Sequence, residues 1–322
     1  MVGGRGGQVG GGTARGGGVD DTDQVKDGDQ AKDAAAPVVR VAGLPGAFLT
    51  WGQALVGAVL AAGGRAGAVL GDSGPGMLEG LKAGQAAVLF VDAPQHALAD
   101  LVTAGVETVE AVRGMTAVLA RLAVLARRDG ALVIGRGDAP GEMVKVLAER
   151  LLGGAVDGVV VPALSEAPGA LPPATAKLAE LVLQPMLASL RGEAAQIVWP
   201  RVCFYDGDRP GEVAPEVIDV VGPARVLAYG PYFHLPPGRW RARAVLSFSE
   251  AACRNQYALD VFTGEQLARG SLRPEQAGAY AAAIGFRHEA VEQRIEFRLW
   301  LVRGAIEGVA AIAQVELEEV LP

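Results

Sequence analysis

The chain has 322 residues, half of them hydrophobic, and a formal net charge of −7. This length is enough for two ordinary domains, and the acidic balance argues against a general nucleic-acid binder or an anionic-membrane binder. Two cysteines and three scattered histidines form neither a disulfide framework nor a zinc-ligand set. We therefore expect no metal, no cofactor and a reducing, cytoplasmic location.

Residues 1–36 are rich in glycine and then in aspartate. Such a composition cannot bury enough apolar surface to offset the chain entropy lost on folding, so it predicts a disordered tail. Glycine follows the tail's arginines where a signal peptide would be hydrophobic. No apolar run reaches the roughly 18 residues that a membrane span needs. Neither a targeting segment nor a membrane span is expected.

From residue 37 to about 192, short apolar runs alternate with patterns of helical period. The runs at 38–41, 66–70, 86–91 and 131–134 predict strands, and the run at 156–164 is a further candidate strand. The patterns at 49–62, 94–102, 109–128, 140–152 and 175–190 predict helices. Strands separated by helices of this length predict right-handed crossovers and a mainly parallel sheet.

Around residue 193 the hydrophobic period changes from about 3.6 to 2. Apolar side chains from Trp240 to Phe248 alternate with arginines, and those from Ile295 to Leu301 alternate with polar residues and Trp300. Short alternating segments separated by Gly and Pro turns predict an antiparallel β-sandwich over residues 193–322. The expected fold class is therefore α/β, with a parallel-sheet domain at 37–192 followed by the sandwich.

The turn between the first strand and the first helix has the layout in which nucleotide-binding folds hold phosphate. Its sequence, Pro45-Gly46-Ala47-Phe48-Leu49-Thr50-Trp51, keeps Pro45, Thr50 and Trp51 of a Pro-Lys-Ser-Gly-Thr-Thr-Trp type loop. On this loop, on Asp92-Ala93-Pro94 after the third strand and on a later loop at 137–141, the segment 38–155 resembles the sulfotransferase branch of P-loop proteins.

That resemblance implies a P-loop-like domain that binds a 3′-phosphoadenosine sulfate donor. The loop's lysine is here Gly46 and its first hydroxyl residue is Ala47, while Asp92 and Asp100 replace the arginine and serine that hold the 3′-phosphate. Phosphate needs cations and hydroxyls, and carboxylates repel it. We predict a retained scaffold with a lost donor site and no catalytic residue. The degenerate site comprises Gly43, Pro45, Gly46, Ala47, Thr50, Trp51, Asp92 and Asp100.

Two alternatives apply to the same segment. The first is an ordinary α/β domain in which the motif match is chance, because strand–turn–helix matches are common. The second is an acid–base cluster of His96 with Asp92 and Asp100 at the end of a parallel strand. A solvated helix start explains these residues more simply.

The segment from Tyr229 to Trp240, YGPYFHLPPGRW, looks like the opening of small β-sandwich modules in bacterial proteins of surface-polysaccharide pathways, which are similar to carbohydrate-binding domains. Aromatic faces pack on sugar rings and neighbouring polar groups fix their orientation. The candidate sugar contacts are Tyr229, Tyr232, His234, Arg294, Arg298 and Trp300. As alternatives, Trp300 contacts the first domain or stacks with arginine, and the tyrosines pack the turn.

The leading hypothesis is a non-catalytic, carbohydrate-associated protein of a bacterial surface-glycan pathway, with a saccharide or a pathway protein as its partner. One alternative is an active glycan-directed sulfotransferase, or another transferase, with an atypical donor site. Another is a structural assembly factor whose sandwich makes protein contacts. The identity of the sugar and the oligomeric state do not follow from the sequence.

Overall fold

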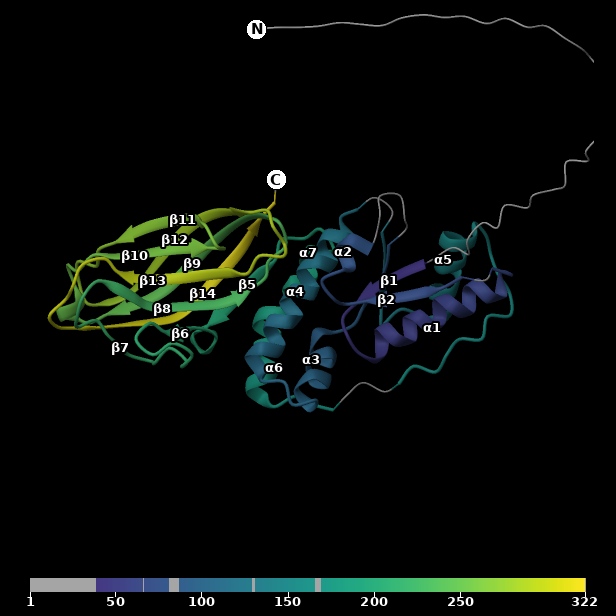
Figure 1. Ribbon diagram of the computed structural model, residues 1–322, viewed down its shortest axis with the longest axis horizontal. Coiled ribbons are helices and arrows are strands. Elements are labelled where there is room, and N and C mark those ends of the chain that lie inside the picture. Colours follow the sequence, from purple (N-terminus) through teal and green to yellow (C-terminus); the bar gives the residue numbers. More distant parts are fainter. Residues whose placement is uncertain (1–38, 66, 81–86, 129–130, 166–168, 322) are drawn as a thin grey trace, which may run out of the picture. The chain divides into compact units, whose positions relative to one another are not determined.

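A parallel sheet of four strands, in the order β2-β1-β3-β4, forms the first part of the computed structural model (Figure 1). The structure describes residues 39–65, 67–80, 87–128, 131–165 and 169–321, so the predicted tail lies outside it. The strands are β1 (Val39–Gly43), β2 (Val69–Asp72), β3 (Val88–Val91) and β4 (Leu132–Gly135), and every pairing is parallel. The predicted parallel sheet is confirmed.

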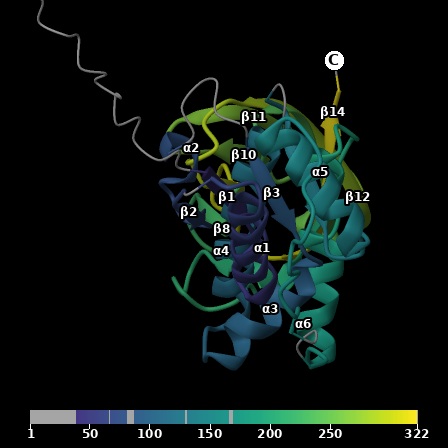
Figure 2. The same cartoon turned by 90° about the vertical axis from the view of Figure 1, so that its right-hand side faces the viewer.

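Helices cover both faces of this sheet. On one face, α1 (Ala47–Ala62) and α5 (Pro140–Leu152) lie side by side and share a buried cluster with Val41, Val88 and Phe90 (Figure 2). On the other face, α3 (Pro94–Thr103) and α4 (Thr108–Ala126) pack with Ala42 and Leu89. A short helix, α2 (Met77–Gly80), follows β2.

Two predicted elements differ from the structure. The candidate strand at 156–164 has no regular secondary structure, and its apolar side chains pack instead on the cluster beneath α1 and α5. The predicted helix at 175–190 is divided into α6 (Pro173–Leu178), a π-helical turn (Ala179–Leu183) and α7 (Met186–Leu190). Pro185 lacks an N–H and cannot continue a helical ladder, and the Gln184 N–H reaches back five residues to the Ala179 carbonyl.

Two antiparallel sheets form the second part, as predicted. The first sheet has the order β11-β10-β13-β8-β6 and the second β12-β9-β14-β5, with β7 also paired to β14. The strands are β5 (Gln196–Pro200), β6 (Tyr205–Asp206), β7 (Ile218–Asp219), β8 (Arg225–Phe233), β9 (Gly238–Phe248), β10 (Tyr257–Phe262), β11 (Gln266–Leu272), β12 (Gly278–His288), β13 (Ile295–Leu301) and β14 (Val309–Val320). In β13, buried residues alternate with partly exposed ones, so one face points into the core.

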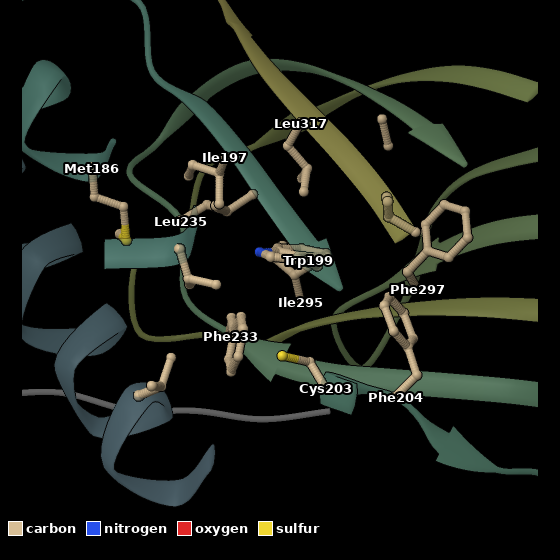
Figure 3. Packing of buried hydrophobic residues seen from close by; sticks show 14 of the residues in the cluster. Met186, Ile197, Trp199, Cys203, Phe204, Phe233, Leu235, Ile295, Phe297 and Leu317 are labelled. Carbon is tan, nitrogen blue, oxygen red and sulfur yellow. The ribbon is translucent and has the colours of Figure 1, made fainter. Parts of the chain in front are cut away.

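The buried core of the sandwich continues into the helices. Trp199 packs edge-on against Phe233 with ring centroids 5.9 Å apart, and Met186 of α7 lies at the edge of the same cluster (Figure 3). Val112, Met115 and other apolar side chains of α4 belong to it as well. The predicted boundary at residues 192–193 marks a change in secondary structure, and the apolar core is continuous across it. None of the helices in the described ranges has the length and apolar character of a membrane span.

Candidate functional site

A crevice lies between the carboxyl ends of β1 and β3, where the strand order reverses and α/β folds usually bind ligands. We call it the switch-point crevice. Its free volume is about 10 Å³, and its lining is drawn from Leu44–Phe48, Asp92, His96, Ala97, Asp100 and Arg136. A cavity needs roughly 10–15 Å³ to hold one water molecule. In this conformation the crevice has no room for a nucleotide.

Asp92 fills the floor of the switch-point crevice and is almost fully paired. Its carboxylate accepts hydrogen bonds from Arg136 Nη1 at 2.9 Å, from the Ala93 N–H at 2.7 Å and from His96 Nδ1 at 2.9 Å. Arg136 also lies 6.0 Å from the centre of the Phe48 ring. The sequence analysis missed Arg136, although its position directly after β4 places it beside the end of β3. Asp92 thus takes part in an internal ion pair.

The other predicted donor-site residues also make internal contacts. A Cβ built on Gly46 would lie 2.9 Å from Asp100 Oδ2, so the Asp100 carboxylate lies against the first turn of α1. Gly46 has φ +132°, a conformation that favours glycine. The Thr50 hydroxyl points back to the Gly46 carbonyl at 3.4 Å. Trp51 is buried, and its indole N–H donates to the Pro162 carbonyl at 2.8 Å. The structure therefore directs these side chains inward and none of them toward a bound phosphate.

On the sandwich, five side chains form one cross-strand row on the first sheet. The pairing registers join Arg269 to Asp260, Asp260 to Arg298, Arg298 to Tyr229, and Tyr229 to Tyr205. We call these five residues the polar row. Their neighbours along β10 and β13 are buried in the core, so the row lies on the outer face of the sheet.

Asp260 organises one half of the polar row. It is fully buried and accepts two parallel hydrogen bonds from Arg298, at 2.7 and 3.0 Å, and one from the Trp300 indole N–H at 3.1 Å. Arg269 approaches it to 3.5 Å. The Arg298 guanidinium lies 4.2 Å from the centre of the Phe262 ring and 5.3 Å from that of Trp300. Trp300 and Arg298 are thus fixed in place by a buried carboxylate that the sequence analysis did not select.

A cluster of three tyrosines forms the other half of this face. Tyr205, Tyr229 and Tyr232 have ring centroids 5.6 to 6.2 Å apart. Arg113 of α4 lies over Tyr205 and Tyr232, at 5.1 and 5.7 Å from the ring centres, and donates to the Pro231 carbonyl at 2.7 Å. The two tyrosines predicted as sugar contacts therefore pack against each other, and Tyr232 packs against the helix layer.

A hollow of about 350 Å³ adjoins the polar row, and we call it the sheet-face hollow. It is lined by Tyr232, Phe262, Thr263, Gly264, Glu292, Gln293, Arg294 and Glu296. Arg294 is exposed and forms no ion pair with any described residue. Burial, together with the nearby Asp260 carboxylate, raises the pKa of Glu296 above its usual value. Burial and the Glu296 charge raise the pKa of Tyr232 to about 12, so its hydroxyl stays neutral.

The six predicted sugar contacts are thus only partly brought together. Tyr232 and Arg294 line the sheet-face hollow, while Arg298 and Trp300 lie on the sheet beside Phe262, which also lines it. His234 lines a different cavity. No group of three His, Cys, Asp or Glu side chains suited to a metal ion occurs among the residues that the structure describes.

These features define a parallel α/β layer joined to an antiparallel β-sandwich. No family model and no curated protein matches the chain. Similar solved structures include TmCBM61 in complex with β-1,4-galactotriose, with 14% identity over 39% of this chain and 88% of that chain and a TM-score of 0.26. The CBM36-1 domain of a multidomain xylanase from the hindgut metagenome of Trinervitermes trinervoides has 11% identity over 39% of this chain and 99% of that chain, with a TM-score of 0.26.

A third similar structure is not a carbohydrate-binding module. The K1 cleaved adhesin domain of Lys-gingipain from Porphyromonas gingivalis has 12% identity over 39% of this chain and 99% of that chain, with a TM-score of 0.29. Likenesses with TM-scores this low carry no argument about what this chain binds.

Proposed function

We propose that the chain is a non-catalytic saccharide-binding protein and that the outer face of the β11-β10-β13-β8-β6 sheet holds the sugar. The observation that carries the proposal is the fixed, partly exposed indole of Trp300, whose N–H is bound to the buried Asp260 carboxylate. A sugar ring packs its C–H face on an indole, and its hydroxyls bind nearby guanidinium and carboxylate groups. Because Trp300 is already held in place, little rotamer entropy is lost on binding.

Trp300 is a better platform than the tyrosines in this geometry. Arg113 already covers Tyr205 and Tyr232, whereas the groups around Trp300 are Arg269 and Arg298 on the open sheet face. The sheet-face hollow beside it adds Arg294 and Glu296, which can bind hydroxyl groups.

The charges on this face favour an acidic saccharide. Three arginines (Arg269, Arg294 and Arg298) face two carboxylates (Asp260 and Glu296), which leaves one excess positive charge when all are ionised. Charged sugars such as uronates should therefore bind more tightly than neutral ones, and this preference should weaken with salt.

The α/β layer, in this proposal, is a P-loop-like scaffold whose sulfate-donor site has been lost. The small volume of the switch-point crevice and the ion pair between Asp92 and Arg136 support this. The chain would act in the cytoplasm, in a bacterial surface-glycan pathway, by holding a saccharide or presenting it to a partner enzyme.

Tryptophan fluorescence tests the saccharide site directly. The other three tryptophans, Trp51, Trp199 and Trp240, are 5%, 1% and 1% exposed, so a ligand-dependent change in emission reports on Trp300. Arrays of neutral and uronate-containing oligosaccharides would select the ligand for titration. Trp300→Ala is expected to weaken binding at least about tenfold, since stacking on a central aromatic dominates such sites.

The matched control is Tyr280→Ala, a partly exposed aromatic on β12 of the other sheet, which should bind as the unchanged protein does. Glycan binding that survives Trp300→Ala, or no binding to any arrayed glycan, would overturn the proposal. A stable protein complex without glycan binding would favour an assembly factor instead. Thermal stabilisation by adenosine 3′,5′-bisphosphate would overturn the lost donor site and favour a transferase.

A further inference from the structure

A second cavity, of about 540 Å³, lies between the helix layer and the sandwich, and we call it the α4 cavity. Its walls come from the loops after β1 and β2, from one face of α4, and from the sandwich residues His234, Glu292 and Arg294. The carboxyl ends of parallel strands are where α/β folds bind ligands, and pockets for small molecules span roughly 300–1,000 Å³. The α4 cavity has the location and the size of a ligand site.

The face of α4 in this cavity has cations at both ends and small residues between them. Arg113 and Arg121 are eight residues apart, about 12 Å along the helix axis, with Gly114 and Ala117 between them. A Cβ built on Gly114 would meet no atom within 4 Å, so the helix surface there is open. Leu101, Met115 and Val118 add an apolar floor.

The polar groups of the cavity are not fully used within the protein. Arg113 is engaged with Glu110, Tyr205 and the Pro231 carbonyl, and Arg121 binds the Glu292 carboxylate through Nε and Nη2. Arg294 has no ion pair or hydrogen bond to any residue in the described ranges. Three guanidinium groups thus face two carboxylates.

His234 provides an independent sign that a ligand is missing. It is only 7% exposed, it lines the cavity, and its Nδ1 has no hydrogen-bond partner within the described part of the chain. Buried polar atoms in native proteins are rarely left unpaired, and those that are often mark a ligand or a water site. Burial, and then the charges of Arg121 and Arg294, lower the pKa of His234 to about 4, so its ring is neutral at pH 7.

We propose that the α4 cavity binds a small organic anion. Its carboxylate or phosphate group lies near Arg294 and Arg121, a polar group of its body pairs with His234, and the rest packs on the apolar floor beside Gly114. This site does not depend on the proposed saccharide site. The contact between Arg113 and Tyr232 separates the two, although Glu292 and Arg294 form walls of both.

Calorimetric titration of the full chain with glucose 6-phosphate, glucuronate and glucose tests the proposal. At least one of the two anions is expected to bind about tenfold or more tightly than neutral glucose, and the comparison between them distinguishes a phosphate site from a carboxylate site. Equal or absent binding of all three would overturn the proposal.

The decisive variant is Gly114→Leu, which fills the cavity from the helix itself. It should reduce the affinity for the anion at least tenfold without lowering the melting temperature, because leucine is a better helix former than glycine. The matched control is Gly57→Leu in α1, where a Cβ also meets no atom within 4 Å and binding should be unchanged.

The same titration with Trp300→Ala separates the two sites. Anion binding is expected to be unchanged in that variant. If Trp300→Ala abolishes it, the anion binds on the sheet face, and this proposal fails while the saccharide proposal stands. Full affinity in folded Gly114→Leu would also overturn the α4 site.

Discussion

Asp260 shows how one buried carboxylate can hold a whole surface in place. It is fully buried, and Arg298, Trp300 and Arg269 all converge on it. Removing one partner of a buried ion pair leaves the other charge desolvated and unpaired. We therefore expect Asp260→Ala to lower the free energy of unfolding by about 3 kcal/mol, measured by urea denaturation, and to weaken saccharide binding because Trp300 loses its anchor.

Two comparison variants define the cause. Arg269→Ala should change stability by about 1 kcal/mol or less, because the Arg269 side chain is 41% exposed and lies 3.5 Å from the carboxylate. The double variant Asp260→Leu with Arg298→Met should recover much of the loss, since it removes both charges together. An Asp260→Ala protein as stable as the Arg269→Ala protein would contradict this account.

At the scale of elements, α4 attaches the helix layer to the sandwich. Four of its side chains reach backbone or carboxylate groups more than 100 residues away: Arg113, Thr116, Arg121 and Arg127. The Thr116 hydroxyl is 1% exposed, accepts the His234 N–H at 3.1 Å and donates to the Arg113 carbonyl at 2.8 Å. It is the most deeply buried of these contacts.

Thr116→Val should reveal the strength of this attachment. Valine has a similar shape but leaves the buried His234 N–H without an acceptor, which should lower the free energy of unfolding by about 1–3 kcal/mol. Thr116→Ser keeps the hydroxyl and should retain most of the stability. Chemical denaturation followed by circular dichroism would measure both variants. Equal stabilities for Val and Ser would show that the hydrogen bond contributes little.

The same helix shows what sequence reasoning could and could not provide. Its apolar period predicted a helix at 109–128, and the structure has one at Thr108–Ala126. The period did not indicate that Arg113 and Arg121 are buried, because their partners Pro231 and Glu292 lie 118 and 171 residues away. Local patterns record local structure, and such distant pairings carry no local signal.

Strand registers limit prediction of the candidate site in the same way. Alternation within β13 placed Arg298 and Trp300 on one face, and the structure does the same. The addition of Asp260 and Tyr205 to that face depends on which residues lie opposite across β10 and β6. Register between strands is set by turns and bulges, and β13 has two irregularities in its pairing with β8. Pro185, by contrast, was a visible signal for the break between α6 and α7.

At the scale of the whole molecule, two buried histidines should make stability depend on pH. His234 and His288 are 7% and 1% exposed, and each has one ring nitrogen without a partner in the described ranges. Burial lowers the pKa of each to about 4 from the usual 6.5, aided at His234 by Arg121 and Arg294. The folded protein therefore keeps both rings neutral at pH values where the unfolded chain protonates them.

The sign of the effect follows from proton binding. Between pH 6.5 and about 4 the unfolded chain binds more protons at these sites, so the free energy of unfolding decreases as the pH falls through this window. Each histidine can contribute up to about 3 kcal/mol. Glu292, whose pKa is lowered mainly by its hydrogen bond with Arg121, acts in the same direction below pH 4.5, whereas Glu296, with a raised pKa, acts in the opposite direction.

Urea denaturation at pH 8, 7, 6 and 5 would measure this dependence. The unchanged protein should be about equally stable at pH 8 and 7 and clearly less stable at pH 5. The variant His234→Gln with His288→Gln carries no group that titrates at these positions, so its stability should vary much less between pH 7 and 5, even if it is less stable at pH 7. If the two proteins lose stability in parallel, the exposed carboxylates and not the buried histidines set the acid sensitivity. The comparison also bears on the α4 cavity, because an anion bound near His234 should add stability at every pH in proportion to its occupancy.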